Sequence, residues 1–260
     1  MSKVTNRLDN SQIAELAKKQ YEQQKQKSKF PANIIHLPSG GKVYAETSTL
    51  HTGTIEMRHM TAYDEDILAN SSYINEGIIF DKLLEALIIT PNIDIDELVS
   101  GDKEWLVISA RILGYGTEYP VSIIDPKTNN PVTANMDLSK LKAKKFNLTA
   151  DTNGCFEYKI PNTNNVIKFK YLSAKTAADI GTENISSKFL KLSIFSINGE
   201  FDNHVIEEFL KYDFKAIDSR KFRKYIIDSA PGINYNTTAI GENGDTVNAT
   251  FQFNADLFWF

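Results

Sequence analysis

Residues 53–64 read GTIEMRHMTAYD and encode a change from strand to helix. Apolar and polar side chains alternate through residues 53–60, which is the pattern of a strand with one buried face. Thr61 stands three positions before Asp64, and this spacing fits a capping box that satisfies the free N–H groups of a new helix. We therefore expect a strand over residues 53–60 and a helix over residues 63–70.

The same order of elements recurs after residue 146. In each half of the chain, two extended segments flank a turn, and a similar tripeptide leads into a short helix. The matching pieces are residues 33–37 with 42–45, residues 156–160 with 166–171, and Met60-Thr61-Ala62 with Leu172-Ser173-Ala174. Such recurrence indicates duplication. We predict an α+β fold of two related lobes, residues 30–150 and 151–260, each with small antiparallel hairpins and packed helices.

Further elements are predicted inside both lobes. Helices are expected at residues 75–89, from residue 94 or 96 to 113, and at residues 176–180, 205–212 and 215–227. Hairpins with turns rich in Pro, Gly and Asn are expected at residues 121–124 with 132–137 and at residues 237–240 with 246–253. Whether Gly101 breaks the helix that begins at residue 94 or 96 is left open.

Residues 1–29 differ in composition from the rest of the chain. They carry seven Lys and Arg residues against three acids, and Ile13, Leu16 and Tyr21 stand at helical spacing. A helix with so thin an apolar stripe is marginal alone and gains stability by docking on another surface. We predict that this segment is a basic amphipathic helix or arm, and that its three apolar side chains contact a partner.

The composition excludes several classes of protein. Of the 260 residues, 42% are hydrophobic and 24% are charged, so the chain can bury a core and is not a disordered protein. A formal net charge of −4 argues against a surface that neutralises nucleic-acid phosphates. One cysteine excludes an intramolecular disulfide and a multi-cysteine zinc site. No apolar run suits a membrane span or a signal peptide, so we expect a cytoplasmic environment.

Motifs for catalysis or metal binding are missing from the sequence. None of the four histidines stands in an H-E-x-x-H motif, and Cys155 has no histidine neighbour along the chain. Pro38-Ser39-Gly40-Gly41-Lys42 lacks the spacing of a phosphate-binding loop. Asp64-Glu65-Asp66 falls in the first turn of a predicted helix, where acids favour the helix dipole. We predict no catalytic, cofactor-binding or metal-binding residues, although a site assembled from distant residues is left open.

A basic face is predicted on the helix at residues 215–227. Lysine and arginine alternate there with aromatic residues, and Lys221, Arg223 and Lys224 are the candidate partner-binding cations. The inward face is expected to include Ile217 and Phe222. A solvated helix face is preferred to binding of nucleic acid, and an acidic partner protein is an equally good use of the same charges.

Three consecutive aromatic residues, Phe258, Trp259 and Phe260, end the sequence. Each aromatic side chain can bury ~150–250 Å², so leaving all three in water is unfavourable. Two alternatives follow: these side chains anchor the last segment in its own domain, or they fill a groove on a neighbouring protein. We include all three among the candidate partner-binding residues.

The order of several motifs resembles one known protein family. The motifs are Leu37-Pro38-Ser39-Gly40-Gly41, IEMRHMTAYDEDIL (residues 55–68), RILGYGTEY (residues 111–119), Asp137-Leu138-Ser139-Lys140-Leu141, Ala230-Pro231-Gly232-Ile233-Asn234 and Leu257-Phe258-Trp259-Phe260. Together they are similar to the baseplate hub subunit and hub assembly proteins of T-even-like contractile-tail bacteriophages, over nearly the whole chain beyond residue 29. Residues 58–65 also resemble tail-assembly chaperones of other long-tailed phages.

The sequence departs from this family's pattern at two turns. Family members often carry a Cys-x-x-Cys-Gly knuckle there, whereas this chain reads DPKTN at residues 125–129 and GENGD at residues 241–245. Neither turn has a thiol, so a metal-binding role of these knuckles is not expected here. Pro, Gly and Asn must hold the turns through backbone geometry alone.

The resemblance implies a protein that acts through its surfaces and not through chemistry of its own. Its partners would be other tail or baseplate proteins, either hub or tape-measure components, with no nucleic acid, no cofactor and no membrane span. It would be assembled in the host cytoplasm and reside in the virion tail baseplate, and homo-oligomers are left open. A transient assembly chaperone that leaves the virion is the alternative. An enzyme and a nucleic-acid-binding module are further alternatives from other classes.

Overall fold

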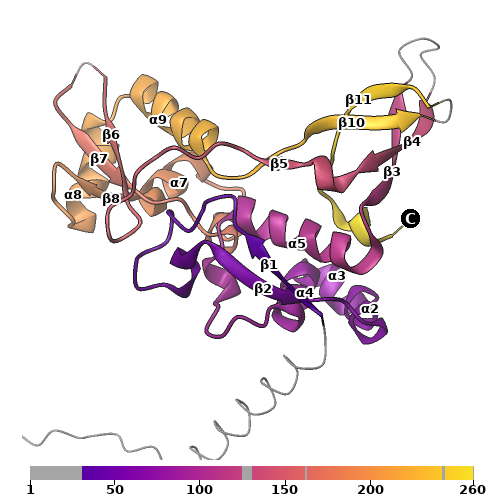
Figure 1. Ribbon diagram of the computed structural model, residues 1–260. Coiled ribbons are helices and arrows are strands. Elements are labelled where there is room, and N and C mark those ends of the chain that lie inside the picture. The colour runs from indigo at the N-terminus through magenta and orange to yellow at the C-terminus, as the bar shows by residue number, and fades with distance from the viewer. Residues whose placement is uncertain (1–30, 125–130, 162, 242–243, 260) are drawn as a thin grey trace, which may run out of the picture.

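The structure of the protein, a computed structural model, describes residues 31–124, 131–161, 163–241 and 244–259 (Figure 1). It confirms the α+β class, because helices and small antiparallel sheets follow one another along the described chain. The predicted N-terminal arm at residues 1–29 lies outside the described residues, as does the whole of the predicted turn at residues 125–129.

The strand-to-helix change at residues 53–64 forms as predicted. The elements on its two sides are β2 (Thr54–Arg58) and α2 (Ala62–Leu68). Ile55 and Met57 on β2 are completely buried, which confirms the alternation in the sequence.

An ion pair and a capping box hold this corner of the fold. The Asp64 carboxylate accepts a hydrogen bond of 2.7 Å from the Thr61 N–H, which is one half of the predicted capping box. Arg58, at the end of β2, donates two further hydrogen bonds of 2.7 Å to the same carboxylate. Burial alone would raise the pKa of Asp64, but the hydrogen bonds from Arg58 and Thr61 outweigh it and lower that pKa. The ionised Asp64 therefore fastens the strand to the helix.

The predicted hairpin of residues 33–37 with 42–45 is wrong. β1 (Ala32–His36) pairs antiparallel with β2, and residues 42–45 form turns and bends. Val43 and Tyr44 are neighbours and both are buried, so this segment lacks the alternation of a strand with one buried face. Residues 42–45 instead belong to the connection between β1 and β2, which packs Val43 and Tyr44 into the core.

Two predicted helices are each divided by non-helical backbone. The observed elements are α3 (Ser71–Glu76), α4 (Ile79–Leu87), the 3-10 turn η2 (Ile95–Glu97) and α5 (Ser100–Tyr115). α3 ends because Gly77 adopts a left-handed φ of 71°, so one predicted helix becomes two. Extended Leu98 and Val99 separate η2 from α5, and Gly101 lies within α5 without breaking it.

The second half contains the predicted hairpin and a group of helices. β6 (Phe156–Lys159) pairs with β7 (Val166–Phe169), and β8 (Ile194–Ile197) adds a third antiparallel strand. The helices are α6 (Ala174–Ala178), α7 (Ile185–Ser193), α8 (Asn203–Glu208) and α9 (Ala216–Ser229), with a π-helical turn, η4 (Phe209–Asp213), after α8. Ser173 caps α6 by accepting from the Thr176 N–H, so it begins a helix as Thr61 does.

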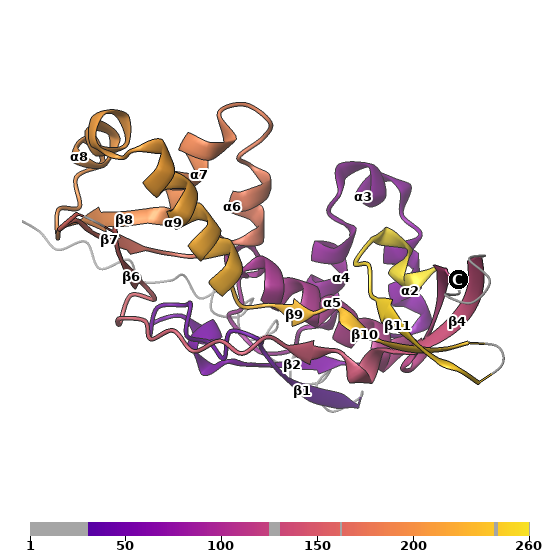
Figure 2. The same ribbon diagram turned by 90° about the horizontal axis from the view of Figure 1, so that it is seen from above.

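The last hairpins of the two predicted lobes join in one sheet. Its strands are β3 (Glu118–Ile124), β4 (Pro131–Asp137), β10 (Asn236–Gly241) and β11 (Thr246–Thr250), in the antiparallel order β11-β10-β4-β3. Beside it, β5 (Lys142–Ala143) pairs with β9 (Ile233–Asn234). Figures 1 and 2 show this sheet at one end of the molecule and α6–α9 at the other. The two related lobes stay a prediction, and the segments assigned to them share this sheet.

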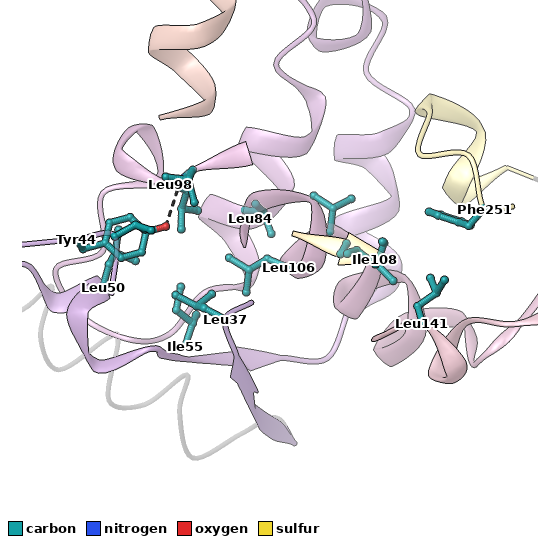
Figure 3. Close-up of a cluster of buried hydrophobic side chains, with 14 of the residues drawn as sticks. Leu37, Tyr44, Leu50, Ile55, Leu84, Leu98, Leu106, Ile108, Leu141 and Phe251 are labelled. Carbon is teal, nitrogen blue, oxygen red and sulfur yellow. Dashed lines mark hydrogen bonds between the residues drawn. The ribbon is translucent and has the colours of Figure 1, made fainter. Parts of the chain in front are cut away.

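α5 lies at the centre of the buried core. Leu106, Val107 and Ile108 are consecutive and completely buried, so neighbouring segments cover this helix on all sides. Figure 3 shows side chains from β2, α4 and the segment after β11 gathered along it, among them Leu84 and Phe251. One hydrophobic core therefore contains residues from both predicted lobes.

Distant segments meet at residues 98–102, which we call the α5 junction. Val99 forms an antiparallel β-bridge with Ser173, just before α6. The chain that leads into β9 crosses Gly101 so closely that a Cβ atom there would lie 2.2 Å from the Pro231 carbonyl oxygen. Only glycine permits this approach of two backbones.

A buried polar network ties a further segment to the α5 junction. The Asp102 carboxylate accepts hydrogen bonds from the Ser39 N–H (2.9 Å), the Ser39 hydroxyl (2.6 Å) and the Tyr44 hydroxyl (2.7 Å). The Tyr44 oxygen accepts in turn from the Val99 N–H (3.2 Å). Burial raises the pKa of Asp102, and the hydrogen bonds from Ser39 and Tyr44 oppose that rise. These donors replace the water that a buried carboxyl group loses.

Gly101→Ala should destabilise the fold although alanine is the better helix former. Helix propensity alone favours alanine by about 1 kcal/mol. The contact with the Pro231 carbonyl should reverse this sign and cost about 1–3 kcal/mol. Gly232→Ala is the matched control, because its Cβ would meet only the Gly101 Cα at 3.8 Å. Urea unfolding measures both, and equal stability of the two variants would contradict the close crossing.

Asp64→Asn should cost more stability at neutral pH than in acid. The folded pKa of Asp64 is lowered, so its contribution is complete above the unfolded value of about 4 and is lost as pH falls through the folded pKa. Removing this partner of a buried ion pair should cost about 3 kcal/mol at pH 7. The exposed neighbour Asp66→Asn is the control. Unfolding free energies measured from pH 7 to pH 2 test this, and a cost independent of pH would exclude the ion pair as its source.

Candidate docking surfaces

Potential metal ligands and nucleophiles are present among the described residues, which include four histidines and one cysteine. Among them, no group of three or more His, Cys, Asp or Glu side chains is placed to hold a metal ion. Cys155 is buried, and burial raises its pKa to about 11, so its thiol stays protonated at neutral pH. None of the described helices has the length and apolar character needed to cross a bilayer.

A polar cleft of about 770 Å³ lies where η2 faces the segment leading into α6. Three of its acids stand close together in sequence, but each has a structural partner. Asp96 pairs with Lys175, and the Glu97 carboxylate accepts from the Ser48 hydroxyl (3.3 Å). Asp94 caps η2 by accepting from the Asp96 N–H (2.9 Å). These interactions stabilise the loop around η2, and all three acids take part in them.

Arg111 on α5 fastens the C-terminal segment to the core. Its guanidinium donates hydrogen bonds to the carbonyl oxygens of Leu257 (3.1 Å), Gly116 (2.9 Å) and Glu118 (3.1 Å). Burial lowers the pKa of Arg111, but an arginine is still protonated at neutral pH. This motif residue therefore acts inside the fold.

The aromatic end of the chain divides into an anchor and an exposed ring. Phe258, in the 3-10 turn η5 (Ala255–Phe258), is 3% exposed, and its ring centroid lies 6.1 Å from that of Phe80 and 6.2 Å from that of Tyr115. For Phe258 the first alternative is correct, because it anchors the segment in its own fold. Trp259 is 49% exposed and stays a candidate partner contact. Phe260 lies outside the described residues.

α9 has the predicted amphipathic character. Phe222 and Ile226 are buried on its inner side, whereas Lys221 and Lys224 are exposed. Ile217, expected on the inner face, is 57% exposed, because the buried positions of this helix are 218, 222 and 226. Contact of the basic face with a partner stays a prediction.

A groove of about 520 Å³ runs between α7 and α9, and we call it the α7–α9 groove. Figures 1 and 2 show these two helices side by side, at the end of the molecule away from the four-stranded sheet. Its apolar lining residues are Ile185 and Phe189 on α7 and Ile227 on α9, and its cations are Arg220, Arg223 and Lys224. The structure thus places two of the predicted cations, Arg223 and Lys224, beside exposed aliphatic side chains, while Lys221 does not line the groove.

Of the other predicted site residues, Phe258 and Trp259 do not line this groove. Ile13, Leu16 and Tyr21 lie outside the described residues, and their role stays a prediction. Ile185 and Phe189 were not among the predicted site residues, and they stand at i, i+4 spacing on α7. That spacing was the available signal for an apolar helix face.

A family model described as T4 bacteriophage base plate protein matches residues 30–259. The matched range covers the whole described fold and, except for residue 260, every motif that carries the family resemblance. No curated protein and no solved structure matches the chain significantly.

Phe258→Ala and Trp259→Ala should separate the anchor from the exposed ring. Phe258→Ala removes a buried ring from its contacts with Phe80 and Tyr115 and should cost about 3 kcal/mol of unfolding free energy. Trp259→Ala should stay within about 0.5 kcal/mol of the wild type, because surface substitutions are usually nearly neutral. Thermal and urea unfolding measure both. A larger loss for Trp259→Ala than for Phe258→Ala would contradict this assignment.

Proposed function

Because the chain belongs to the family of T4 bacteriophage base plate proteins, we propose that it occupies the central hub of the baseplate and acts there by docking to other tail proteins. The family gives it a structural role in the baseplate of the virion tail. The observation that carries the proposal is the family match over residues 30–259. The motifs that resemble hub subunits narrow the proposed position to the hub.

The internal use of these motif residues supports action through surfaces. Ser39 is bonded to Asp102, Arg58 is paired with Asp64, and Arg111 holds the Leu257 carbonyl. These residues stabilise the fold, so the resemblance lies in a scaffold and not in a reaction centre. A scaffold of this kind works by presenting exposed faces to partners.

The proposed contacts with hub or tape-measure components are the exposed basic side of α9, the exposed Trp259, and the basic segment that the sequence predicts at residues 1–29. The basic side of α9, Trp259 and residues 1–29 differ in chemistry, so each suits a different surface. Several docking faces on one chain are what a position between several tail proteins requires. Contact between copies of this chain is a further use of the same faces.

A transient assembly chaperone that is not retained in the virion is the alternative. Residues 58–65 favour it through their resemblance to tail-assembly chaperones. In this fold, however, Arg58 and Asp64 of that segment form an internal ion pair next to the capping box. The motif is therefore compatible with either role, and it does not weigh against the hub.

The retained role predicts that purified phage particles contain this protein. Mass spectrometry of virions should detect it in a fixed ratio to baseplate proteins, and particles produced without its gene should lack a functional baseplate. Absence from virions that nevertheless require the gene for assembly would establish the chaperone instead. Fully assembled, infectious tails without the gene would contradict both roles.

A further inference from the structure

The α7–α9 groove leaves aliphatic side chains in water. Ile185 on α7 and Ile227 on α9 are 52% and 65% exposed, and both line the groove together with the half-buried Phe189. Covering such a surface with apolar side chains of a partner is favourable. We propose that this groove binds an acidic amphipathic helix of another baseplate protein, and the identity of the partner as a baseplate protein rests on the proposed function.

The charges around the groove select an acidic occupant. Arg220, Arg223 and Lys224 line it, against the single carboxylate of Asp228. Asp228 pairs with Lys224 at 2.8 Å, and Arg223 donates to the neutral Ser186 hydroxyl on α7. A net positive lining beside an apolar strip attracts a segment that carries carboxylates next to its apolar side chains.

The spacing of the lining residues fits a helix. On α9 they recur at positions 220, 223, 224 and 227, so they follow one face for about two turns, or roughly 11 Å. On α7, Ile185 and Phe189 are one turn apart. A helix with apolar residues at i, i+3 or i+4, and i+7 can lie between these rows with its acids beside the arginines.

Other occupants fit the charges less well. Residues 1–29 of the same chain carry seven basic residues against three acids, so they would be repelled by the groove. A second copy related by a two-fold axis would place the same three cations against one another. Nucleic acid would gain little from exposed isoleucines, because bases bind by stacking on aromatic side chains.

Binding of model helices to the full chain tests the chemistry directly. One fluorescent peptide carries leucines at i, i+4 and i+7 with flanking glutamates, and its counterpart carries lysines in place of the glutamates. We expect the acidic peptide to bind at least about tenfold more tightly in fluorescence anisotropy. Equal binding of the two peptides, or no binding of either, would overturn the proposal.

Variants on one helix provide matched controls. Arg220→Glu and Ile227→Glu should weaken binding of the acidic peptide by at least about tenfold. Lys221→Glu and Ile217→Glu make the same changes on α9 outside the groove lining, and we expect them to stay within about twofold of the wild type. Urea unfolding checks that all four variants fold. Equal losses in the groove variants and the controls would contradict a site in the groove.

The assembled particle identifies the occupant. A photo-crosslinking amino acid at position 227 should join an acidic helix of another baseplate protein, and one at position 217 should not. Cross-links to residues 1–29, to a second copy or to nucleic acid would each replace the proposed occupant. Normal, infectious tails with Arg220→Glu, where loss of the gene abolishes the baseplate, would reject the groove and leave the proposed function standing. Infectious tails without the gene would reject the proposed function, and peptide binding would then decide the groove alone.

Discussion

The contact between the first turn of α5 and the chain at residues 230–232 is the constraint on which the rest of the fold depends. Gly101 lets two backbones touch where a single methyl group would collide with the Pro231 carbonyl. Its neighbour Asp102, in the same helical turn, accepts hydrogen bonds from the hydroxyl groups of Ser39 and Tyr44. Gly101 thus allows close packing of the segment at residues 230–232, and the adjacent Asp102 holds the segment that contains Ser39 and Tyr44 through a buried carboxyl group. The position of α5 in the core follows from both contacts.

This arrangement accounts for a baseplate protein in which the motif residues face inward. Ser39 and Arg111 make internal contacts that join distant segments, and Asp64 fastens β2 to the neighbouring α2. Ile185 on α7 and Ile227 on α9 are more than half exposed, so their apolar side chains are available to a partner. The motif residues named here thus stabilise the fold, whereas the residues proposed for recognition include exposed apolar side chains outside these motifs.

Sequence patterns over a few residues correctly predicted the elements that depend on interactions between residues close together in the chain. The strand and capping box at residues 53–64 and the β6–β7 hairpin formed as expected, because alternation and turn residues act within a few positions. The partner of β1, the crossing at Gly101 and the joining of two hairpins depend on packing between remote segments, which no window of sequence contains. The same limit applied to the candidate site. The cations of α9 were visible in the sequence, but the walls of the groove required α7, and the burial of Phe258 required Phe80 and Tyr115.

The four-stranded sheet can form completely only after the second half of the chain has been synthesised, because β4 pairs with β10. β4 emerges from the ribosome long before β10, its neighbour in the sheet. Arg111 likewise donates to the carbonyl of Leu257, which lies 146 residues further along the chain. Until then the edge of β4 offers unpaired backbone groups to any passing chain, which is a hazard for aggregation. Contacts so distant in sequence also make folding slow. The first half of the chain is therefore most prone to aggregation before the second half has been synthesised.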